Sequence, residues 1–255
     1  MNAKDDGPAE EAGVRSVLRA LDLLALFTEG SSRWNVRELA EASGLAKTTT
    51  LRLVSTLERR GLLWAAGAGE YSAGPGLLRW SRLARSAWQL SEPARQIIRD
   101  LAQHCGETVN VYVRSDIHRV CVAQEEGPQA LRHVVRVGDE LPLWSGAAGK
   151  VLLADADDAL LERISATAEV AVADLRAQVA HAAEQGYAVT HGERELGASG
   201  LSAPVLDSAN RVVAALGLGG PTPRFTDEKV VEFAAAVRRA ADEVSRIGLV
   251  PGSSQ

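Results

Sequence analysis

Residues 35–64 read NVRELAEASGLAKTTTLRLVSTLERRGLLW, and the order of signals in this stretch decides the fold of the N-terminal part of the chain. Asn35 is a suitable cap for a short helix over residues 36–42, and Glu38 stands where a capping box places its acid. Ser43 and Gly44 then interrupt the helical pattern, because glycine readily adopts the left-handed conformation of a tight turn. The stretch therefore opens with a capped helix and a sharp turn.

A second helix is expected over residues 47–60, and Gly61 ends it. Two short strands follow at 62–64 and 71–72, joined by a turn at 66–69. Two helices across a glycine turn, followed by a β-ribbon, form the pattern of a winged helix-turn-helix. The apolar positions of the second helix that we expect to face the core are Leu51, Val54 and Leu57.

The second helix opens with polar side chains that suit DNA. Lysine and arginine bind phosphates and guanine edges, and threonine hydroxyls bind phosphates and bases. Three consecutive threonines read alone fit a capped, solvated helix start equally well. The succession of helix, glycine turn, polar helix and β-wing favours DNA binding, with Arg15 and Arg52 on phosphates and the wing turn near the backbone. The residues predicted to contact DNA are Arg15, Arg33, Lys47, Thr48, Thr49, Thr50 and Arg52.

The charge of the chain is unevenly distributed. The 255 residues have a net charge of −5, which by itself gives no sign of a nucleic-acid partner. Residues 14–82 contain ten basic and six acidic residues and are net +4, whereas residues 1–13 are net −3 and the remainder is net −6. A basic N-terminal block on an acidic body is typical of a chain that brings one end to phosphates.

Several function classes lack support in the sequence. The two cysteines, Cys105 and Cys121, form no CxxC motif, and we expect both to be core residues. The histidines lack metal-ligand spacing, and residues 146–150 (GAAGK) lack the form of a phosphate-binding loop. No nucleophile and base pair is visible, so we expect no enzyme, no metal and no cofactor. With no signal peptide and no apolar run of roughly 18 residues, we expect a cytoplasmic protein that does not enter a membrane.

The remaining signals predict an α+β chain with two domains. Residues 1–13 are expected to be a disordered tail, 14–75 the winged helix-turn-helix, 76–90 a linker helix, and 91–255 a domain with an antiparallel sheet. Ser91 and Thr226 are expected to cap helices, and 138–149 to be a loop of small residues. The strands predicted in this domain lie at 107–114, 118–126, 130–137, 187–190, 200–207 and 211–219.

On these motifs the sequence resembles the IclR family. The matching stretches are RALDLLALF (19–27), LPLWSGAAGKVLLA (141–154), EQGYAVTHGERELGASGLSAPVLD (184–207) and RVVAALGLGGPTPRFTDE (211–228). The third stretch is similar to that of actinobacterial members linked to amino-acid metabolism. The resemblance implies a GAF-like C-terminal domain that binds a small metabolite effector, and homodimers or dimers of dimers formed through the N-terminal half. It also implies a regulator that is usually a repressor.

The resemblance also implies where an effector would bind. Members that bind small carboxylates carry an acid where Thr190 stands, a cysteine at Gly200, and serines at Gly217 and Gly219. The loss of these polar groups predicts a larger or less polar effector, held by backbone N–H groups. Glycines can equally mark close packing, and then no ligand would bind. The implied lining is Ala147, Ala148, Thr190, Gly200, Gly217 and Gly219, with Leu143, Trp144 and Leu201 nearby.

These observations predict a ligand-responsive, sequence-specific regulator that binds a double-stranded DNA operator and represses a metabolic operon. The alternative is a DNA-binding regulator of the same fold without a small-molecule effector, controlled by its abundance or by a protein partner. Glu193, Arg194 and Glu195 are interpreted as a solvated charge cluster beside the pocket instead of an acid and base site. Ligand-dependent stabilisation of the protein would separate the two hypotheses.

Overall fold

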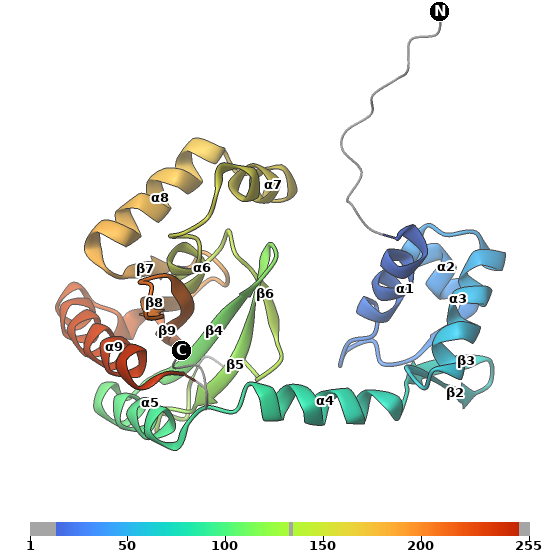
Figure 1. Ribbon diagram of the computed structural model, residues 1–255, viewed down its shortest axis with the longest axis horizontal. Coiled ribbons are helices and arrows are strands. Elements are labelled where there is room, and N and C mark those ends of the chain that lie inside the picture. Colours follow the sequence, from blue (N-terminus) through green and yellow to red (C-terminus); the bar gives the residue numbers. More distant parts are fainter. Residues whose placement is uncertain (1–13, 133–134, 250–255) are drawn as a thin grey trace, which may run out of the picture. The chain divides into compact units, whose positions relative to one another are not determined.

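The computed structural model describes residues 14–132 and 135–249, and the expected tail at 1–13 lies outside the described residues. The chain forms two compact units that divide between Ser86 and Ala87. The expected mixture of a helical N-terminal part and a C-terminal antiparallel sheet is confirmed (Figure 1).

The N-terminal unit contains four helices and a small sheet in the described residues. Its strands lie in the order β1-β3-β2 and pair antiparallel. The strand β1, which pairs with β3, is absent from the sequence prediction because a two-residue strand leaves no alternation to detect. The elements are α1 (Arg15–Ala25), β1 (Trp34–Asn35), α2 (Val36–Ser43), α3 (Lys47–Arg59), β2 (Leu63–Gly67), β3 (Glu70–Ala73) and α4 (Gly76–Ala87).

The capping box that the sequence indicates is confirmed. The Asn35 side chain accepts hydrogen bonds from the backbone N–H groups of Arg37 and Glu38, both at 3.0 Å. Glu38 in turn accepts from the backbone N–H of Asn35 at 2.9 Å. Gly44 ends α2 in the left-handed conformation with φ of 67°. These contacts fix where α2 begins and where the chain turns toward α3.

The core of this unit contains Leu23, Leu39, Val54, Leu57 and Leu63. The expectation that Leu51 also faces the core is wrong, since 49% of it is exposed. The inward stripe of α3 is instead Thr50, Val54 and Leu57, which recur at the spacing of one helical face. Leu51 lies one residue, or about 100°, away from that stripe.

The C-terminal unit is built on a six-stranded antiparallel sheet in the order β6-β5-β4-β9-β8-β7. Helices α5 and α9 pack on one face of the sheet, while α6, α7 and α8 belong to a second core cluster (Figure 1). The strands are β4 (Thr108–Ser115), β5 (His118–Glu125), β6 (Glu140–Pro142), β7 (Ala188–His191), β8 (Ala198–Leu206) and β9 (Val212–Pro221). The helices are α5 (Glu92–Cys105), α6 (Ala147–Leu152), α7 (Asp158–Ala168), α8 (Val172–Gln185), the short 3-10 helix η1 (Thr222–Arg224) and α9 (Asp227–Ile247).

One strand of the sequence prediction is wrong. The described residues of 130–137 form no strand, and residues 133–134 lie outside the described part of the chain. The partner of β5 is instead β6, within the stretch 138–149 that was expected to be a loop. The backbone carbonyl of Cys121 accepts a hydrogen bond from the N–H of Gly138, and the backbone N–H of Cys121 donates to the carbonyl of Asp139. The chain therefore pairs with β5 only beyond residue 137.

The expected caps of two long helices are confirmed. The Ser91 side chain accepts from the backbone N–H of Ala94 at 3.3 Å, and Thr226 accepts from that of Lys229 at 3.4 Å. The helix expected over residues 76–90 ends at Ala87. These caps fix the starts of α5 and α9, the two helices that cover one face of the sheet.

Candidate functional site

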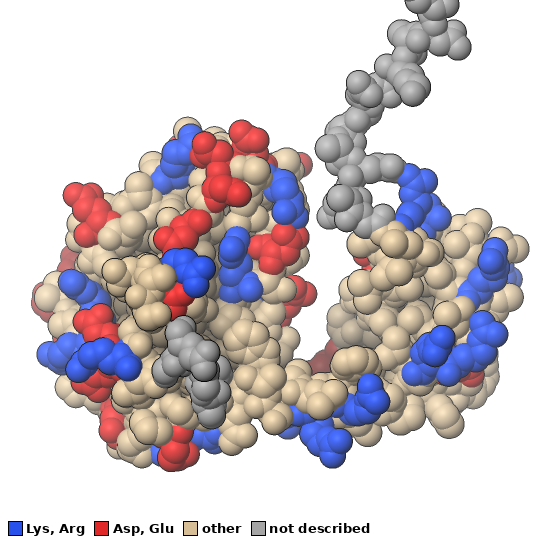
Figure 2. All heavy atoms as spheres, in the orientation of Figure 1, with Lys and Arg blue, Asp and Glu red and all other residues tan. Residues whose placement is uncertain are grey.

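The N-terminal end of α3 presents a polar, basic surface. Lys47, Thr48 and Arg52 are exposed, and Thr49 is partly buried. Within the described part of the chain, neither Lys47 nor Arg52 takes part in an ion pair. Figure 2 shows several basic and few acidic side chains on the visible face of this unit, whereas the C-terminal unit carries both signs. The side chains needed to contact phosphates and base edges are therefore available on one short helical segment.

The prediction that Thr50 contacts DNA is wrong for this conformation. Thr50 is fully buried, and its hydroxyl donates to the backbone carbonyl of Ala46 at 3.3 Å. It lies on the same face of α3 as Val54 and Leu57, which is the core face. Its neighbours Thr48 and Thr49 point elsewhere because each step along a helix turns a side chain by about 100°.

The remaining predicted DNA contacts lie outside α3. Arg15, in the first turn of α1, is exposed, and so is Arg33, whose guanidinium lies 3.6 Å from the Glu70 carboxylate. The tip of the wing is the two-residue turn of Ala68 and Gly69, with φ of 52° and 78°. Two successive positive φ values are typical of the tight turn of a β-hairpin. Both turn residues are exposed, so the wing tip is open to a partner.

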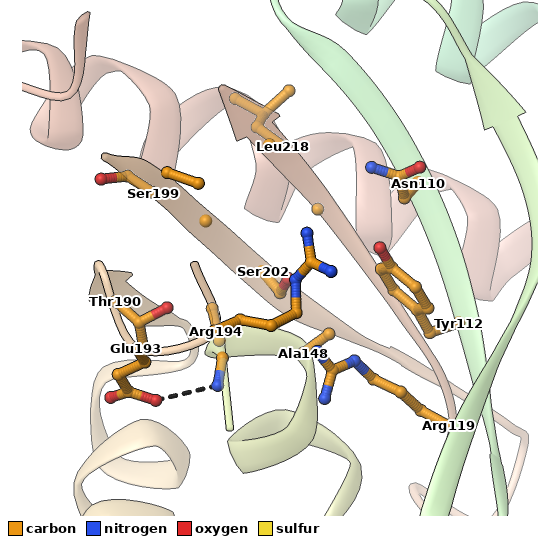
Figure 3. Close-up of a pocket in the computed structure, with 16 residues that line it drawn as sticks. Asn110, Tyr112, Arg119, Ala148, Thr190, Glu193, Arg194, Ser199, Ser202 and Leu218 are labelled. Atoms are coloured by element: carbon orange, nitrogen blue, oxygen red, sulfur yellow. Dashed lines mark hydrogen bonds between the residues drawn. The ribbon is translucent and has the colours of Figure 1, made fainter. Parts of the chain in front are cut away.

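The C-terminal unit contains a polar pocket of about 60 Å³. Its walls come from β4, β5, β7, β8 and β9, the beginning of α6, and the segment between β7 and β8 (Figure 3). Six of the nine residues that the resemblance placed at the effector site line this pocket. They are Ala147, Ala148, Thr190, Gly200, Gly217 and Gly219.

The other three do not line it. Leu201 is fully buried in the core between the sheet and α9, because successive side chains of β8 face opposite sides of the sheet. Its neighbours Gly200 and Ser202 face the pocket. Leu143 is fully buried in the second core cluster, and Trp144 packs against that cluster with its ring 6.2 Å from that of His118. Leu201 and Leu143 are core residues and Trp144 is partly buried beside the core, so the prediction that these three bind the effector is wrong for this structure.

The glycines of the pocket do not all create space. A Cβ at Gly217 would overlap the hydroxyl of Ser202 and the backbone carbonyl of Leu201, so Ser202 already fills the volume of the absent side chain. At Gly200, by contrast, the nearest non-neighbouring atom to a Cβ would be the Leu218 carbonyl oxygen at 3.6 Å, an ordinary contact. The expectation of an enlarged, less polar pocket is therefore wrong at Gly217.

Sequence reasoning missed most of the polar lining. The most informative omission is Arg119, which lies in the predicted strand HRVCVAQEE. Charged residues are rarely buried, so an arginine at an inward-facing position of this strand indicates a functional site. Others come from segments that meet only in the folded chain. Glu193 and Arg194, which the sequence placed beside the pocket, line it. The polar lining residues that were missed are Asn110, Tyr112, Arg119, Ser199 and Ser202 (Figure 3).

Arg119 is only 3% exposed. Its Nη1 donates to the backbone carbonyls of Pro142 and Ser145, and its guanidinium carbon lies 5.4 Å from the centroid of the Tyr112 ring. Burial lowers the pKa of Arg119 to about 10, an effect that the tyrosine opposes and the positive charge of Arg194 increases. The group remains protonated near pH 7, so the pocket contains a buried cation.

Glu193 joins two segments of the pocket wall. Its carboxylate accepts from the backbone N–H of Gly146 at 2.8 Å and from the Nζ of Lys150. The Lys150 side chain is only 5% exposed, and burial lowers its pKa while Glu193 raises it. Glu193 is 36% exposed, as expected of a charge cluster beside the pocket, and in addition it forms part of the pocket wall through these two contacts. The backbone N–H of Gly146, which also lines the pocket, is therefore already paired.

The remaining sequence expectations concern the cysteines, possible metal ligands and possible membrane helices. Cys121 is fully buried and Cys105 partly so, and both thiols are free. Among residues 14–132 and 135–249, no three His, Cys, Asp or Glu side chains group as metal ligands would. In the same part of the chain, none of the helices has the length and apolar character needed to cross a membrane.

An exposed helix-turn-helix with a wing, joined in one chain to a second unit with a polar pocket, defines a class of transcription regulators. Comparison with known families identifies the family. The model of the IclR helix-turn-helix domain matches residues 16–64, and the bacterial transcriptional regulator IclR C-terminal model matches residues 84–246. The chain belongs to the IclR family, whose members here are transcription regulators and not enzymes.

Individual relatives support the same assignment over nearly the whole chain. The transcriptional repressor IclR of Escherichia coli is 31% identical over 91% of this chain and 89% of its own length. The crystal structure of an IclR-family regulator from Rhodococcus sp. is 43% identical, covers 99% of this chain and 100% of that one, and has a TM-score of 0.64. An IclR homologue from Microbacterium hydrocarbonoxydans shares the fold at 20% identity, with 91% and 100% of the two chains covered and a TM-score of 0.65.

Proposed function

We propose that this protein is a ligand-responsive repressor that acts in the cytoplasm on a specific DNA operator of a metabolic operon. The observation that carries the proposal is the presence, in one chain, of the exposed basic start of α3 and the polar pocket with a buried cation, Arg119. Repression is supported by the E. coli relative, which is itself named a repressor. An effector is supported by the Microbacterium homologue, whose structure is a complex with 4-hydroxybenzoate.

The proposed regulator acts as a homodimer or a dimer of dimers assembled through the N-terminal unit. Large apolar side chains are exposed there on α1 and α4, with Leu78 at 73% the most exposed on α4. An apolar hollow beside Trp64 and Leu77 includes the same leucine. A second copy of the chain that buries these side chains would place two recognition helices on two half-sites of the operator. The exposed apolar side chains are Val14, Val17, Leu21, Leu78, Trp80 and Leu83.

The assembly is tested by light scattering on the full chain after gel filtration. We expect a dimer or tetramer for the wild type and a lower mass for Leu78→Glu, because a charge in an apolar interface is costly to bury. Leu196→Glu is the matched control, since Leu196 is 94% exposed on the C-terminal unit. An unchanged mass for Leu78→Glu would contradict assembly through this face.

DNA recognition is tested by fluorescence anisotropy on labelled DNA from upstream of the gene, across a salt series. We expect a specific complex that survives competitor DNA, and an affinity that falls as salt rises. Arg52→Gln should weaken binding and reduce the slope of the salt dependence by about one, the value for one phosphate contact. Arg37→Gln is the control, because Arg37 lies on α2 and pairs with Glu41 at 2.8 Å. Failure to bind any sequence selected from the genome would overturn the proposal.

A further inference from the structure

Most of the net positive charge of the N-terminal unit lies away from the start of α3. Residues 14–58, which include every predicted DNA contact, contain six basic and five acidic residues. Residues 59–86 contain five basic residues and a single acidic one, Glu70. Because neutralised phosphates supply a large share of the affinity for DNA, a cationic stretch with no assigned role in a DNA-binding unit needs an explanation.

The five basic residues are all arginines, and all are exposed. Within the described part of the chain none of them takes part in an ion pair, and Glu70 lies 3.6 Å from the guanidinium of Arg33 instead. Figure 2 shows basic side chains gathered over α4. We call the five residues the arginine tract: Arg59 and Arg60 at the end of α3, and Arg79, Arg82 and Arg85 on α4.

Close backbone packing joins the two parts of the tract. The N–H of Gly76 donates to the carbonyl of Gly61 at 2.8 Å, and the N–H of Gly74 donates to that of Leu62 at 2.8 Å. A Cβ at Gly74 or Gly76 would overlap the Gly61 carbonyl, so only glycine lets the chain entering α4 lie directly on the chain leaving α3. The arginines of both helices therefore belong to one fixed part of the N-terminal unit.

The spacing on α4 forms a stripe along the helix. Arg79, Arg82 and Arg85 recur every third residue, so they lie within an arc of about 120° and rise by about 4.5 Å from one to the next. The stripe is about 9 Å long, and phosphates of one DNA strand are separated by about 3.4 Å along the duplex axis. The guanidinium carbon of Arg79 lies 5.1 Å from the centroid of the Trp80 ring, which restricts its motion. Such a stripe can follow a phosphate backbone.

We propose, resting on the proposed DNA-binding function, that the arginine tract binds DNA phosphates that flank the sequence read by the start of α3. Guanidinium groups bind phosphates through two parallel hydrogen bonds, and the tract contains no lysine. It belongs to the same compact unit as α3, so a duplex held by α3 brings phosphates to that unit. These contacts carry no sequence information and strengthen binding to operator and unrelated DNA alike.

One other anionic partner is consistent with the charge alone. Residues 87–255 contain 16 basic and 23 acidic residues, so the C-terminal unit of a second copy could also attract the tract. DNA is favoured because arginine matches phosphate geometry and because the recognition helix lies in the same unit as the tract. Contact between copies is a distinct outcome of the test.

The test measures anisotropy of the full chain across a salt series on two labelled duplexes. One is the shortest operator duplex that keeps specific binding, and the other is the same duplex lengthened by about one helical turn at each end. We expect a steeper salt dependence on the longer duplex, because more phosphates are neutralised. A triple glutamine variant should lower that slope by about three per bound chain, leave the slope on the short duplex unchanged, and weaken long operator and long scrambled DNA by the same factor. Its changes are Arg79→Gln, Arg82→Gln and Arg85→Gln.

Two control variants separate phosphate contacts from total charge. Lysine at the same three positions of α4 keeps the cations and should keep most of the slope. A second triple variant removes the same number of charges from exposed arginines of α8 and α9 and should leave both slopes unchanged. All variants should have the wild-type mass in light scattering. The second variant carries Arg176→Gln, Arg239→Gln and Arg246→Gln.

The outcomes separate this inference from the function on which it rests. Equal wild-type slopes on the two duplexes, or an equal loss of slope from the α8 and α9 control, would overturn the arginine tract as a phosphate site. Specific operator binding would then still support the proposed regulator. A lower mass of the α4 glutamine variant with unchanged slopes would assign the arginines to contact between copies. If the wild type binds no DNA at all, both the inference and the proposed function are wrong.

Discussion

The buried pair of Lys150 and Glu193 allows a quantitative prediction. Glu193→Gln keeps the shape of the side chain and an oxygen that can accept from the Gly146 N–H, but removes the negative charge. Lys150, only 5% exposed, is then a buried cation without a counter-charge. Removing one partner of a fully buried pair costs about 3–5 kcal/mol. Since 36% of the Glu193 side chain is exposed, solvent screening reduces our expectation to about 2–3 kcal/mol.

The assay is thermal and denaturant unfolding of the full chain, followed by circular dichroism. For a unit of this size we expect Glu193→Gln to lower the melting temperature of the C-terminal unit by roughly 4–12 °C. The matched control is Glu232→Gln, which removes an exposed pair of the same residue types, with Lys229 Nζ 2.7 Å from the carboxylate. We expect its melting temperature to stay within experimental error of the wild type.

The pH dependence provides a second, independent check. Burial lowers the pKa of Lys150, so between that folded-state value and the ordinary value of 10.5 the folded chain binds fewer protons than the unfolded chain. Stability from this group therefore rises with pH across that window. Loss of Glu193 lowers the pKa further and widens the window, so the deficit of Glu193→Gln should shrink between pH 7 and pH 10. A deficit below about 0.5 kcal/mol at pH 7, or one that grows with pH, would refute the reasoning.

Three other experiments test the structure. Thr50→Val should change stability by less than about 1.5 kcal/mol in chemical denaturation and leave the affinity for DNA at fixed salt unchanged, because the hydroxyl is buried; clearly weaker DNA binding would restore Thr50 as a DNA contact. Gly217→Ala should cost about 1–3 kcal/mol through overlap with its neighbours, whereas Gly200→Ala should be tolerated in the same thermal assay. Burial raises the pKa of Cys105 to about 11 and that of Cys121 to about 12, so at pH 8 fewer than about one thiol in a thousand is ionised. Ellman's reagent should therefore react far more slowly with the folded than with the unfolded chain, and equal rates would contradict this.

Local signals in the sequence were enough to define the helical unit. The capping box of Asn35 and Glu38 and the left-handed turn at Gly44 depend on neighbours within four residues, so they are visible without a fold. The caps at Ser91 and Thr226 are of the same kind. The family resemblance then placed most of the small residues around the pocket, because their spacing along β8, β9 and the start of α6 is itself a motif.

Tertiary structure alone decided which side chains give the pocket its character. Lys150 and Glu193 are 43 residues apart, and Arg119 approaches Arg194 only after β5 and the segment before β8 meet around one cavity. Because side chains alternate along a strand, the sequence predicts that Leu201 and Ser202 face opposite sides of the sheet. Only the packing of α9 decides which of these two sides is the core. Charge and burial at this site are properties of several segments together. The sequence by itself therefore determined the family and the fold class, and the assembled sheet determined that Arg119 is a buried cation in the pocket.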